Sequence, residues 1–332
     1  MKLPNRVFAC GRPHPDSFVR NVAITLEEMG VTVATLPTLP GKAYKSQSLV
    51  FAADIAKRIV PGFKKWGIHK IVNLIKDFKP DLVLTLTREL DLEAVEQIRL
   101  QTRALIVHWY TDSLANLGRE ELVNNPYDAV FLKYQDATDR LRGLFGDRFH
   151  YLPEAMNPLW HKPEDPSPRY QCTVGLAGNI YPYRCRVLEQ LLDYDIKIWG
   201  PSPPRWLKSP ALKFYTGEYV AEHSKAVAFS SATVSLNTLS LREGNAMNCR
   251  AFEVAGCGGY QVMEHRPVVS DFFEPGKEIL LYRNLEELKE QINRGLKDSA
   301  FNKSVRAAAA KRAVAEHTYE HRLKTMFNIL YL

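Results

Sequence analysis

The chain has 332 residues, of which 45% are hydrophobic and 24% are charged, and its formal net charge is +7. This composition excludes an intrinsically disordered chain, and the length predicts two domains of about 150 residues each. The positive charge favours an anionic partner, such as a nucleoside diphosphate, an acidic lipid headgroup at a membrane surface or nucleic acid.

The cysteines and the first residues indicate the redox state of the thiols and the cellular location to expect. Five cysteines without a C-x-x-C pair predict neither a zinc site nor a disulfide framework. The opening stretch, MKLPNRVFACGRP, lacks the long apolar region of a secretory signal, and no run of about 20 apolar residues follows it. We therefore expect reduced thiols and a cytoplasmic protein, whereas peripheral membrane contact and the oligomeric state stay open.

The first half of the chain alternates between two kinds of apolar pattern. Short apolar runs bounded by turn residues predict strands, and segments with 3.6-residue apolar spacing predict helices between them. The expected strands lie at 6–10, 32–37, 81–86, 104–110, 128–133 and 149–152, and the expected helices at 17–29, 48–77, 90–100 and 136–145. This alternation predicts a parallel, doubly wound sheet.

A proline-rich stretch at 161–170, HKPEDPSPRY, predicts a linker, after which the pattern restarts. The expected strands lie at 172–177, 196–199, 211–214, 232–237, 259–263 and 279–282, and the expected helices at 183–193, 218–228, 248–256, 284–295, 300–316 and 318–330. We therefore expect two Rossmann-like domains, at 1–160 and 170–315, that face each other across a cleft. A closing helix at 316–332 is expected to pack back on the first domain.

The strongest candidate site is the polar stretch EGNAMNCRAFEVAGCGG at 243–259. A helix beginning near Asn248 would direct unpaired backbone N–H groups at an anion. Arg250 in its first turn could hold a pyrophosphate through two hydrogen bonds, and Glu253, one turn later, could accept hydrogen bonds from both ribose hydroxyls. The alternative is an exposed i,i+3 ion pair between Arg250 and Glu253, which stabilises a helix by only about 0.2–0.5 kcal/mol.

A second polar element, VGLAGNIYPYR at 174–184, follows the first strand of the second half. Gly178 and Asn179 predict a tight turn, and Arg184 opens the next helix. Because ligands of such sheets bind beyond the carboxyl ends of the strands, both elements should line the same edge of the cleft. This placement favours an anion site over a simple ion pair.

The stretch at 248–288, NCRAFEVAGCGGYQV…FFEPGKEILLYRNLEEL, resembles the donor-binding block of group 1 glycosyltransferases, in the branch typified by the spore maturation protein CgeB. GLAGNIYPYRCRVLEQL resembles a second element of that branch, and AEHTYEHRLKTM resembles its closing helices. The resemblance spans about residue 104 to the end. It implies a GT-B fold, in which a nucleotide-activated sugar binds the second domain, and an acceptor glycan, protein or small molecule binds the first.

The resemblance also implies roles for individual residues. Arg184 and Arg250 would neutralise the diphosphate, Glu253 would hold the ribose, and Asn179 and Asn248 would frame the sugar phosphate. No cofactor is expected beyond the donor substrate, with UDP as the favoured nucleotide. The better-known group 1 enzymes space two glutamates eight residues apart, whereas Glu243 and Glu253 are ten apart, so Glu243 is not assigned to the sugar.

No metal site is expected. The Asp-x-Asp string at 193–195 falls at a predicted junction between a helix and a strand, and we interpret it as a cap and turn. A helix N-terminus and two arginines could neutralise the leaving group in place of a cation.

The first half offers candidates for the base that removes the acceptor proton. Asp112, at a predicted strand end, is the leading candidate, although it could instead cap a helix beginning at Ser113. His14 lies between two prolines and could be either a base or a rigid turn residue, and His108 lies near the same strand end as Asp112. Inverting and retaining chemistry both stay open, and a retaining enzyme would need no such base.

Other functions would also fit two facing Rossmann-like domains. A sugar-nucleotide epimerase would need an acid/base pair in the second domain, where only His265 is placed for it, and a sugar phosphorylase would need a pyridoxal lysine. A non-catalytic sugar- or nucleotide-binding protein is the alternative from another class. Nucleic acid is the less favoured partner, because the sequence carries no basic and aromatic tract of the kind that follows a strand.

Overall fold

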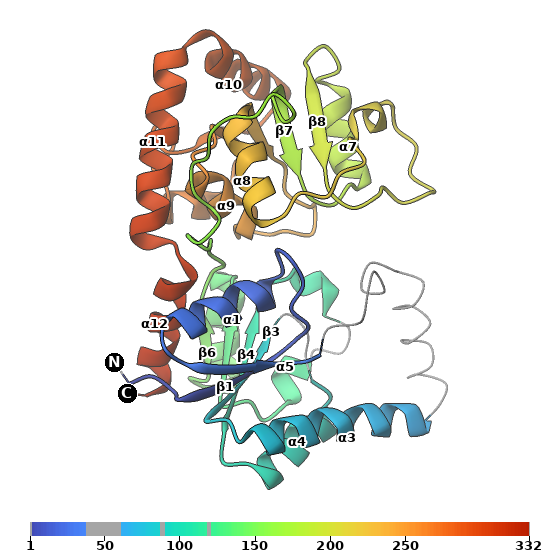
Figure 1. Ribbon diagram of the computed structural model, residues 1–332, viewed down its shortest axis with the longest axis vertical. Helices are drawn as coiled ribbons and strands as arrows, with labels where there is room; N and C mark the ends of the chain where they lie inside the picture. Colours follow the sequence, from blue (N-terminus) through green and yellow to red (C-terminus); the bar gives the residue numbers. More distant parts are fainter. Residues whose placement is uncertain (1, 38–60, 87–89, 118–120, 332) are drawn as a thin grey trace. The chain divides into compact units, whose positions relative to one another are not determined.

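The computed structural model describes residues 2–37, 61–86, 90–117 and 121–331. The chain forms two compact units (Figure 1). The first comprises Met1–Leu152 and Leu323–Leu332, and the second comprises Pro153–Arg322. The part of the expected helix at 48–60 lies outside the described residues.

The first unit contains a six-stranded sheet in which all the paired strands run parallel. Its strand order is β2-β1-β3-β4-β5-β6. The strands are β1 (Arg6–Cys10), β2 (Thr32–Thr35), β3 (Leu82–Leu86), β4 (Leu105–Tyr110), β5 (Ala129–Leu132) and β6 (Phe149–Tyr151). Each of the six strands predicted for this half is present. The central residues of β1, β3, β4 and β5 are buried, as expected for a parallel sheet whose two faces are both covered by helices, whereas those of the edge strands β2 and β6 are only partly buried.

Helices connect these strands. They are α1 (Phe18–Glu28), α3 (Pro61–Phe78), α4 (Leu92–Gln101), α5 (Glu121–Asn124) and α6 (Gln135–Phe145), with a short 3₁₀ helix η2 (Leu114–Asn116). Ser17 caps α1, because its hydroxyl accepts a hydrogen bond from the backbone N–H of Arg20. This cap fixes where the chain leaves the loop that follows β1.

The second unit contains a five-stranded parallel sheet in the order β11-β10-β9-β7-β8. The strands are β7 (Cys172–Ala177), β8 (Ile196–Trp199), β9 (Ala232–Asn237), β10 (Gln261–Glu264) and β11 (Leu280–Tyr282). Its helices are α7 (Pro182–Glu189), α8 (Glu222–Ser231), α9 (Cys249–Gly256), α10 (Leu285–Lys297) and α11 (Ser299–Glu316), with 3₁₀ helices η3 (Pro210–Phe214) and η4 (Pro267–Asp271). The last helix, α12 (Tyr319–Leu330), begins in this unit, and its residues from Leu323 onward belong to the first unit. Within the described ranges, no helix is both long and apolar enough to cross a membrane.

Two expectations about the second half are wrong. The strand predicted at 211–214 is the 3₁₀ helix η3, because the Ser209 hydroxyl accepts a hydrogen bond from the Ala211 N–H and starts a turn there. The stretch at 161–170 is part of the second unit rather than a linker, and the boundary falls after Leu152. Its backbone is tied to the end of α8, where Glu164 N–H donates to Ser230 Oγ at 3.0 Å.

The strand order of the second sheet creates a topological switch point beside β7. The chain passes from β7 to β8 on one side and then to β9 on the other side. The connections after β7 and β9 therefore leave the carboxyl edge in opposite directions, and in open α/β sheets such a point is where ligands bind. Figure 1 shows β7 and β8 with α7 and α8 in this unit.

Candidate functional site

Two arginine side chains meet over Gly178, at the carboxyl end of β7. Gly178 has a φ of +133°, which L side chains rarely adopt. A Cβ at this position would overlap the Arg250 guanidinium and would lie 3.4 Å from Nη1 of Arg184. Glycine is therefore required at this position for two reasons: the backbone conformation and the space taken by the two guanidinium groups.

The turn at Gly178 is held against the end of the neighbouring strand. Its N–H donates to the Trp199 carbonyl at the end of β8, at 2.8 Å. A Cβ on Gly200 would overlap the Gly178 carbonyl oxygen. This close approach of two backbones fixes the position of the turn.

Arg184 lies in α7 and is only 2% exposed. Its Nε donates to Thr238 Oγ1 at 2.8 Å, its Nη2 donates to the Thr238 carbonyl and the Tyr181 hydroxyl at 3.1 Å each, and its Nη1 donates to the Asn179 carbonyl. All these acceptors are neutral, so they orient the guanidinium without cancelling its charge. Burial, and next the charge of Arg250, lower the pKa of Arg184 to about 9.

Arg250 lies in the first turn of α9 and is half-buried. Its Nη1 donates to Asn237 Oδ1 at 3.2 Å, at the end of β9. Among the described residues, neither Arg250 nor Arg184 forms an ion pair with a carboxylate. Two uncompensated positive charges at the switch point make a site that favours a multiply charged anion.

An amide network fixes the start of α9. Asn248 caps the helix, since its Oδ1 accepts from the Ala251 N–H at 3.1 Å, and it exchanges two 3.1 Å hydrogen bonds with Asn237. Asn237 Nδ2 also donates to Gln261 Oε1 at 3.1 Å, on the adjacent strand β10. The network sets the position of Arg250, whereas the expected contact of Asn248 with a sugar phosphate stays a prediction.

The N-terminus of α9 differs from the expectation of unpaired N–H groups. The Cys249 N–H donates to Oε2 of Glu154 at 3.1 Å, and the Ala251 N–H is used by Asn248. A buried carboxylate of the chain itself thus occupies part of the place assigned to an external anion. The arginines, more than the helix N-terminus, define the candidate anion site.

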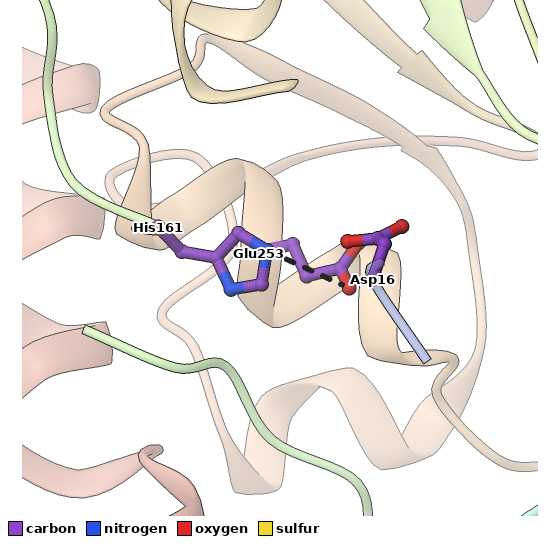
Figure 2. Close-up of side chains that lie close together, drawn as sticks. All are labelled: Asp16, His161 and Glu253. Carbon is purple, nitrogen blue, oxygen red and sulfur yellow. Dashed lines mark ion pairs between the residues drawn. The ribbon is translucent and has the colours of Figure 1, made fainter. Parts of the chain in front are cut away.

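Glu253 is paired with a lysine, not with Arg250. Its Oε2 lies 3.0 Å from Nζ of Lys225, and the two residues are 4% and 6% exposed. Its Oε1 lies 3.8 Å from Nε2 of His161 (Figure 2). The alternative of an exposed i,i+3 ion pair between Arg250 and Glu253 is therefore wrong. Asp16, the third side chain labelled in Figure 2, belongs to the first unit.

The Asp-x-Asp string lies at the amino end of β8. Asp193 and Asp195 are exposed and precede the strand, which begins at Ile196. The arginines lie beyond the carboxyl ends of parallel strands in the same sheet. The string and the candidate anion site are therefore at opposite edges of this sheet.

Asp112 and His14 lie in different connections of the first unit, and each has local contacts. Asp112 follows β4, and its carboxylate accepts from the Ser113 N–H at 2.7 Å and from Asn116 Nδ2 at 3.0 Å. Ser113 caps the short helix η2. His14 is exposed in the turn after β1, where its Nδ1 lies 3.1 Å from the Pro15 carbonyl. Their expected roles as bases stay predictions.

His108 does not lie at a strand end. It is fully buried in β4, where its Nδ1 lies 2.5 Å from Thr85 Oγ1 and its ring stacks on Tyr127. Burial lowers its pKa to about 4. It is therefore a neutral core residue and not a candidate base for chemistry at the sheet edge.

Sequence reasoning missed Lys225, His161, Asn237 and Glu154. Asn237 could have been found, because it is the last residue of a predicted strand beside the candidate site. The others contact the α9 segment from positions far away in the sequence, and no local pattern marks them.

Comparisons with known proteins agree with this architecture. Residues 184–328 match a family model described as "Glycosyl transferase-like". No curated protein sequence matches the chain. Sucrose-phosphate synthase from Thermosynechococcus elongatus is similar over 98% of both chains, with a TM-score of 0.68 and 14% sequence identity.

Two further solved structures are similar over the whole chain. A UDP-forming α,α-trehalose-phosphate synthase from Burkholderia xenovorans, in complex with glucose-6-phosphate, has a TM-score of 0.65 and 12% identity, with 98% of this chain and 99% of that chain covered. HepE from Anabaena, in complex with UDP and glucose, has a TM-score of 0.62 and 12% identity, with the same coverage. The predicted GT-B fold is confirmed, and residues 184–328 are similar to glycosyl transferase-like domains.

Proposed function

We propose that this chain is a group 1 glycosyltransferase that moves a sugar from a nucleoside diphosphate-sugar, with UDP as the favoured nucleotide, to an acceptor hydroxyl. One observation carries the proposal: Arg184 and Arg250 converge on Gly178 at the switch point of the second sheet, with no carboxylate partner among the described residues. The family match at 184–328 covers both arginines and supports the same reaction class.

The proposed chemistry follows from the charge that develops on the leaving group. The bond between the anomeric carbon and the diphosphate oxygen breaks, the acceptor oxygen bonds to that carbon, and the base takes up the acceptor proton, with Asp112 and His14 as its proposed candidates. Negative charge accumulates on the diphosphate, and the preorganised guanidinium groups stabilise it. In this proposal Arg250 contacts the diphosphate directly, whereas Arg184 acts through its field and through the loop that it orders.

The donor is proposed to bind with its diphosphate at Gly178 and Arg250. In this proposal Glu253, one turn along α9 from Arg250, accepts hydrogen bonds from the ribose hydroxyls. Asn179 and Asn248 complete the proposed nucleotide-sugar site. Asp112 and His14 are the proposed candidates for the base, and the acceptor is a glycan, a protein or a small molecule.

The test combines binding with turnover. UDP and UDP-glucose, added to the full chain with a chelator present, should stabilise it by about 2.7 kcal/mol at 100 times the dissociation constant. Arg250→Ala should abolish this shift. Arg186→Ala is the matched control, because Arg186 is an exposed arginine of α7 that pairs with Glu189 at 2.7 Å.

Other outcomes would contradict parts of the proposal. Equal UDP affinity in Arg250→Ala and the wild type would remove the diphosphate from this site. Activity that disappears on chelation and returns with added metal would refute a metal-independent mechanism. Conversion of UDP-glucose into an epimer would favour the epimerase, and tight binding without turnover across donors and acceptors would favour a non-catalytic binding protein.

A further inference from the structure

A buried lysine supports the carboxylate of Glu253. Lys225 lies in α8, and its Nζ is 3.0 Å from Oε2 of Glu253 in α9. Both side chains are almost completely removed from solvent. Desolvating two opposite charges is costly, and a buried ion pair is often no more stabilising than apolar residues of the same volume. The pair therefore suggests a role beyond holding the fold together.

The pair leaves the two carboxylate oxygens of Glu253 unequal. Lys225 engages Oε2, whereas Oε1 accepts no hydrogen bond from another residue in the described part of the chain. His161 Nε2 lies 3.8 Å from Oε1, which is beyond hydrogen-bonding distance. Oε1 is therefore the oxygen available to a ligand.

His161 limits how the carboxylate can turn. The ring is fully buried, and its Nδ1 accepts the N–H of Asn157 at 3.0 Å, so the ring proton of the neutral tautomer is on Nε2, which faces Glu253. Figure 2 shows the imidazole beside the Glu253 side chain. The ammonium on one oxygen and the imidazole beside the other give the Glu253 carboxylate one fixed orientation.

The fixed carboxylate lies one helical turn from Arg250, on the same face of α9. In a nucleotide, the ribose is bonded to the first phosphate. A carboxylate one turn from the arginine that binds the diphosphate is therefore within reach of the ribose hydroxyls. A neutral or freely rotating side chain would lose most of that interaction, because hydrogen bonds to a charged, preoriented acceptor are the stronger ones.

We propose that Lys225 is a positioning residue for ribose recognition: it holds the Glu253 side chain in one orientation and directs Oε1 at the vicinal hydroxyls of a nucleoside diphosphate. This inference rests on the proposed function and goes one step further, since it assigns the choice of ribose over deoxyribose to a residue that touches no ligand. The 2′-hydroxyl is the group that the oriented Glu253 carboxylate would recognise, because deoxyribose lacks it.

The experiment compares the dissociation constants of UDP and 2′-deoxy-UDP, and of GDP and 2′-deoxy-GDP, by calorimetry on the full chain. The wild type should prefer the ribonucleotide by about 10-fold or more, as expected for a hydrogen bond to a charged acceptor. Glu253→Gln and Lys225→Met should each bring the two affinities within about 2-fold, because the first removes the charged acceptor and the second removes the group that orients it. Lys225→Arg should keep most of the preference.

Lys277→Met is the matched control. Lys277 also pairs with a glutamate, Glu274, at 2.9 Å, but both side chains are at least 60% exposed. This variant should keep the full ribose preference. A loss of preference in Lys277→Met as large as in Lys225→Met would overturn the inference.

The outcomes separate this inference from the proposed function. A wild type that binds no nucleoside diphosphate refutes the proposed function itself. A wild type that binds UDP and 2′-deoxy-UDP equally, or a Lys225→Met variant that keeps the wild-type preference, overturns only the role of Lys225. If Lys225→Met does not fold, Glu253→Gln and Lys225→Arg decide: lost preference in the first with retained preference in the second supports the inference, and any other combination overturns it.

Discussion

Arg184 and Arg250 reach the same glycine, Gly178, from two different helices, and within the described residues neither of them is neutralised by a carboxylate. Like charges are normally kept apart or compensated in a folded protein. Their convergence at the carboxyl edge of a parallel sheet is therefore the feature of this molecule that most directly predicts a ligand.

Gly178→Ala should abolish nucleotide binding. The added Cβ would displace the Arg250 guanidinium, and the φ of +133° would add backbone strain of about 1 kcal/mol or more. Gly217→Ala is the control, because Gly217 also has a positive φ, +76°, but has open space around its Cβ position. Both variants should lower the melting temperature, and only Gly178→Ala should lose UDP in calorimetry. Equal retention of UDP would separate the glycine from the site.

Removing Arg184 should cost more stability than removing Arg250. Arg184→Ala leaves the buried Thr238 hydroxyl and carbonyl and the part-buried Asn179 carbonyl without their donor, and we expect a loss of about 2–3 kcal/mol in the free energy of unfolding. Arg250→Ala gives up one 3.2 Å hydrogen bond from a half-buried side chain, so we expect a loss of about 1 kcal/mol or less. Urea denaturation measures both values. A larger loss in Arg250→Ala would mean that this side chain has a structural role.

Asp112→Asn distinguishes a base from a turn residue. A general base contributes about 100-fold to 10,000-fold to the rate, so the substitution should lower kcat by at least about 100-fold with the UDP affinity unchanged. A residue that only accepts hydrogen bonds from Ser113 and Asn116 would instead cost about 1 kcal/mol of stability and leave kcat almost intact. His14→Gln, assayed in parallel, tests the second candidate.

His108 should make the protein acid-sensitive. Burial lowers its pKa from 6.5 to about 4, so the unfolded chain binds a proton more readily than the folded chain between those two values. Stability is complete above about pH 6.5 and falls as the pH drops toward 4, by about 3 kcal/mol at most. His108→Phe keeps a ring against Tyr127 and removes the titration, so its unfolding free energy should fall less between pH 7 and pH 4.5. An equally steep fall in the variant would assign the acid sensitivity to other groups.

The sequence predicted most of the fold because buried parallel strands leave a clear local signal. Each strand of the first sheet is an apolar run between turn residues, and all six were expected within about two residues of their observed positions. The stretch at 211–214 misled the prediction because it is short and apolar, and such a stretch fits a strand or one turn of helix equally well. The cap at Ser209 decided between them.

Some residues of the candidate site could likewise be predicted from local sequence, and others could not. Arg184, Arg250 and Gly178 could be named because they stand at strand ends and helix starts. Lys225 and Glu154 could not, because they reach the α9 segment from positions 28 and 95 residues distant, through contacts that only the folded chain creates. The expectation of open N–H groups at the start of α9 failed for this reason.

The burial of Arg184 also bears on how ionic strength should affect the molecule. Dissolved ions screen a charge through the solvent around it. The Arg184 guanidinium is enclosed by Thr238, Tyr181 and the Asn179 carbonyl, so it has almost no solvent around it. Its attraction for a diphosphate would therefore survive added salt that weakens the many exposed lysines and arginines of this basic chain. Donor binding that persists in concentrated sodium chloride would distinguish the site at Arg184 and Arg250 from the nonspecific binding of polyanions to the protein surface.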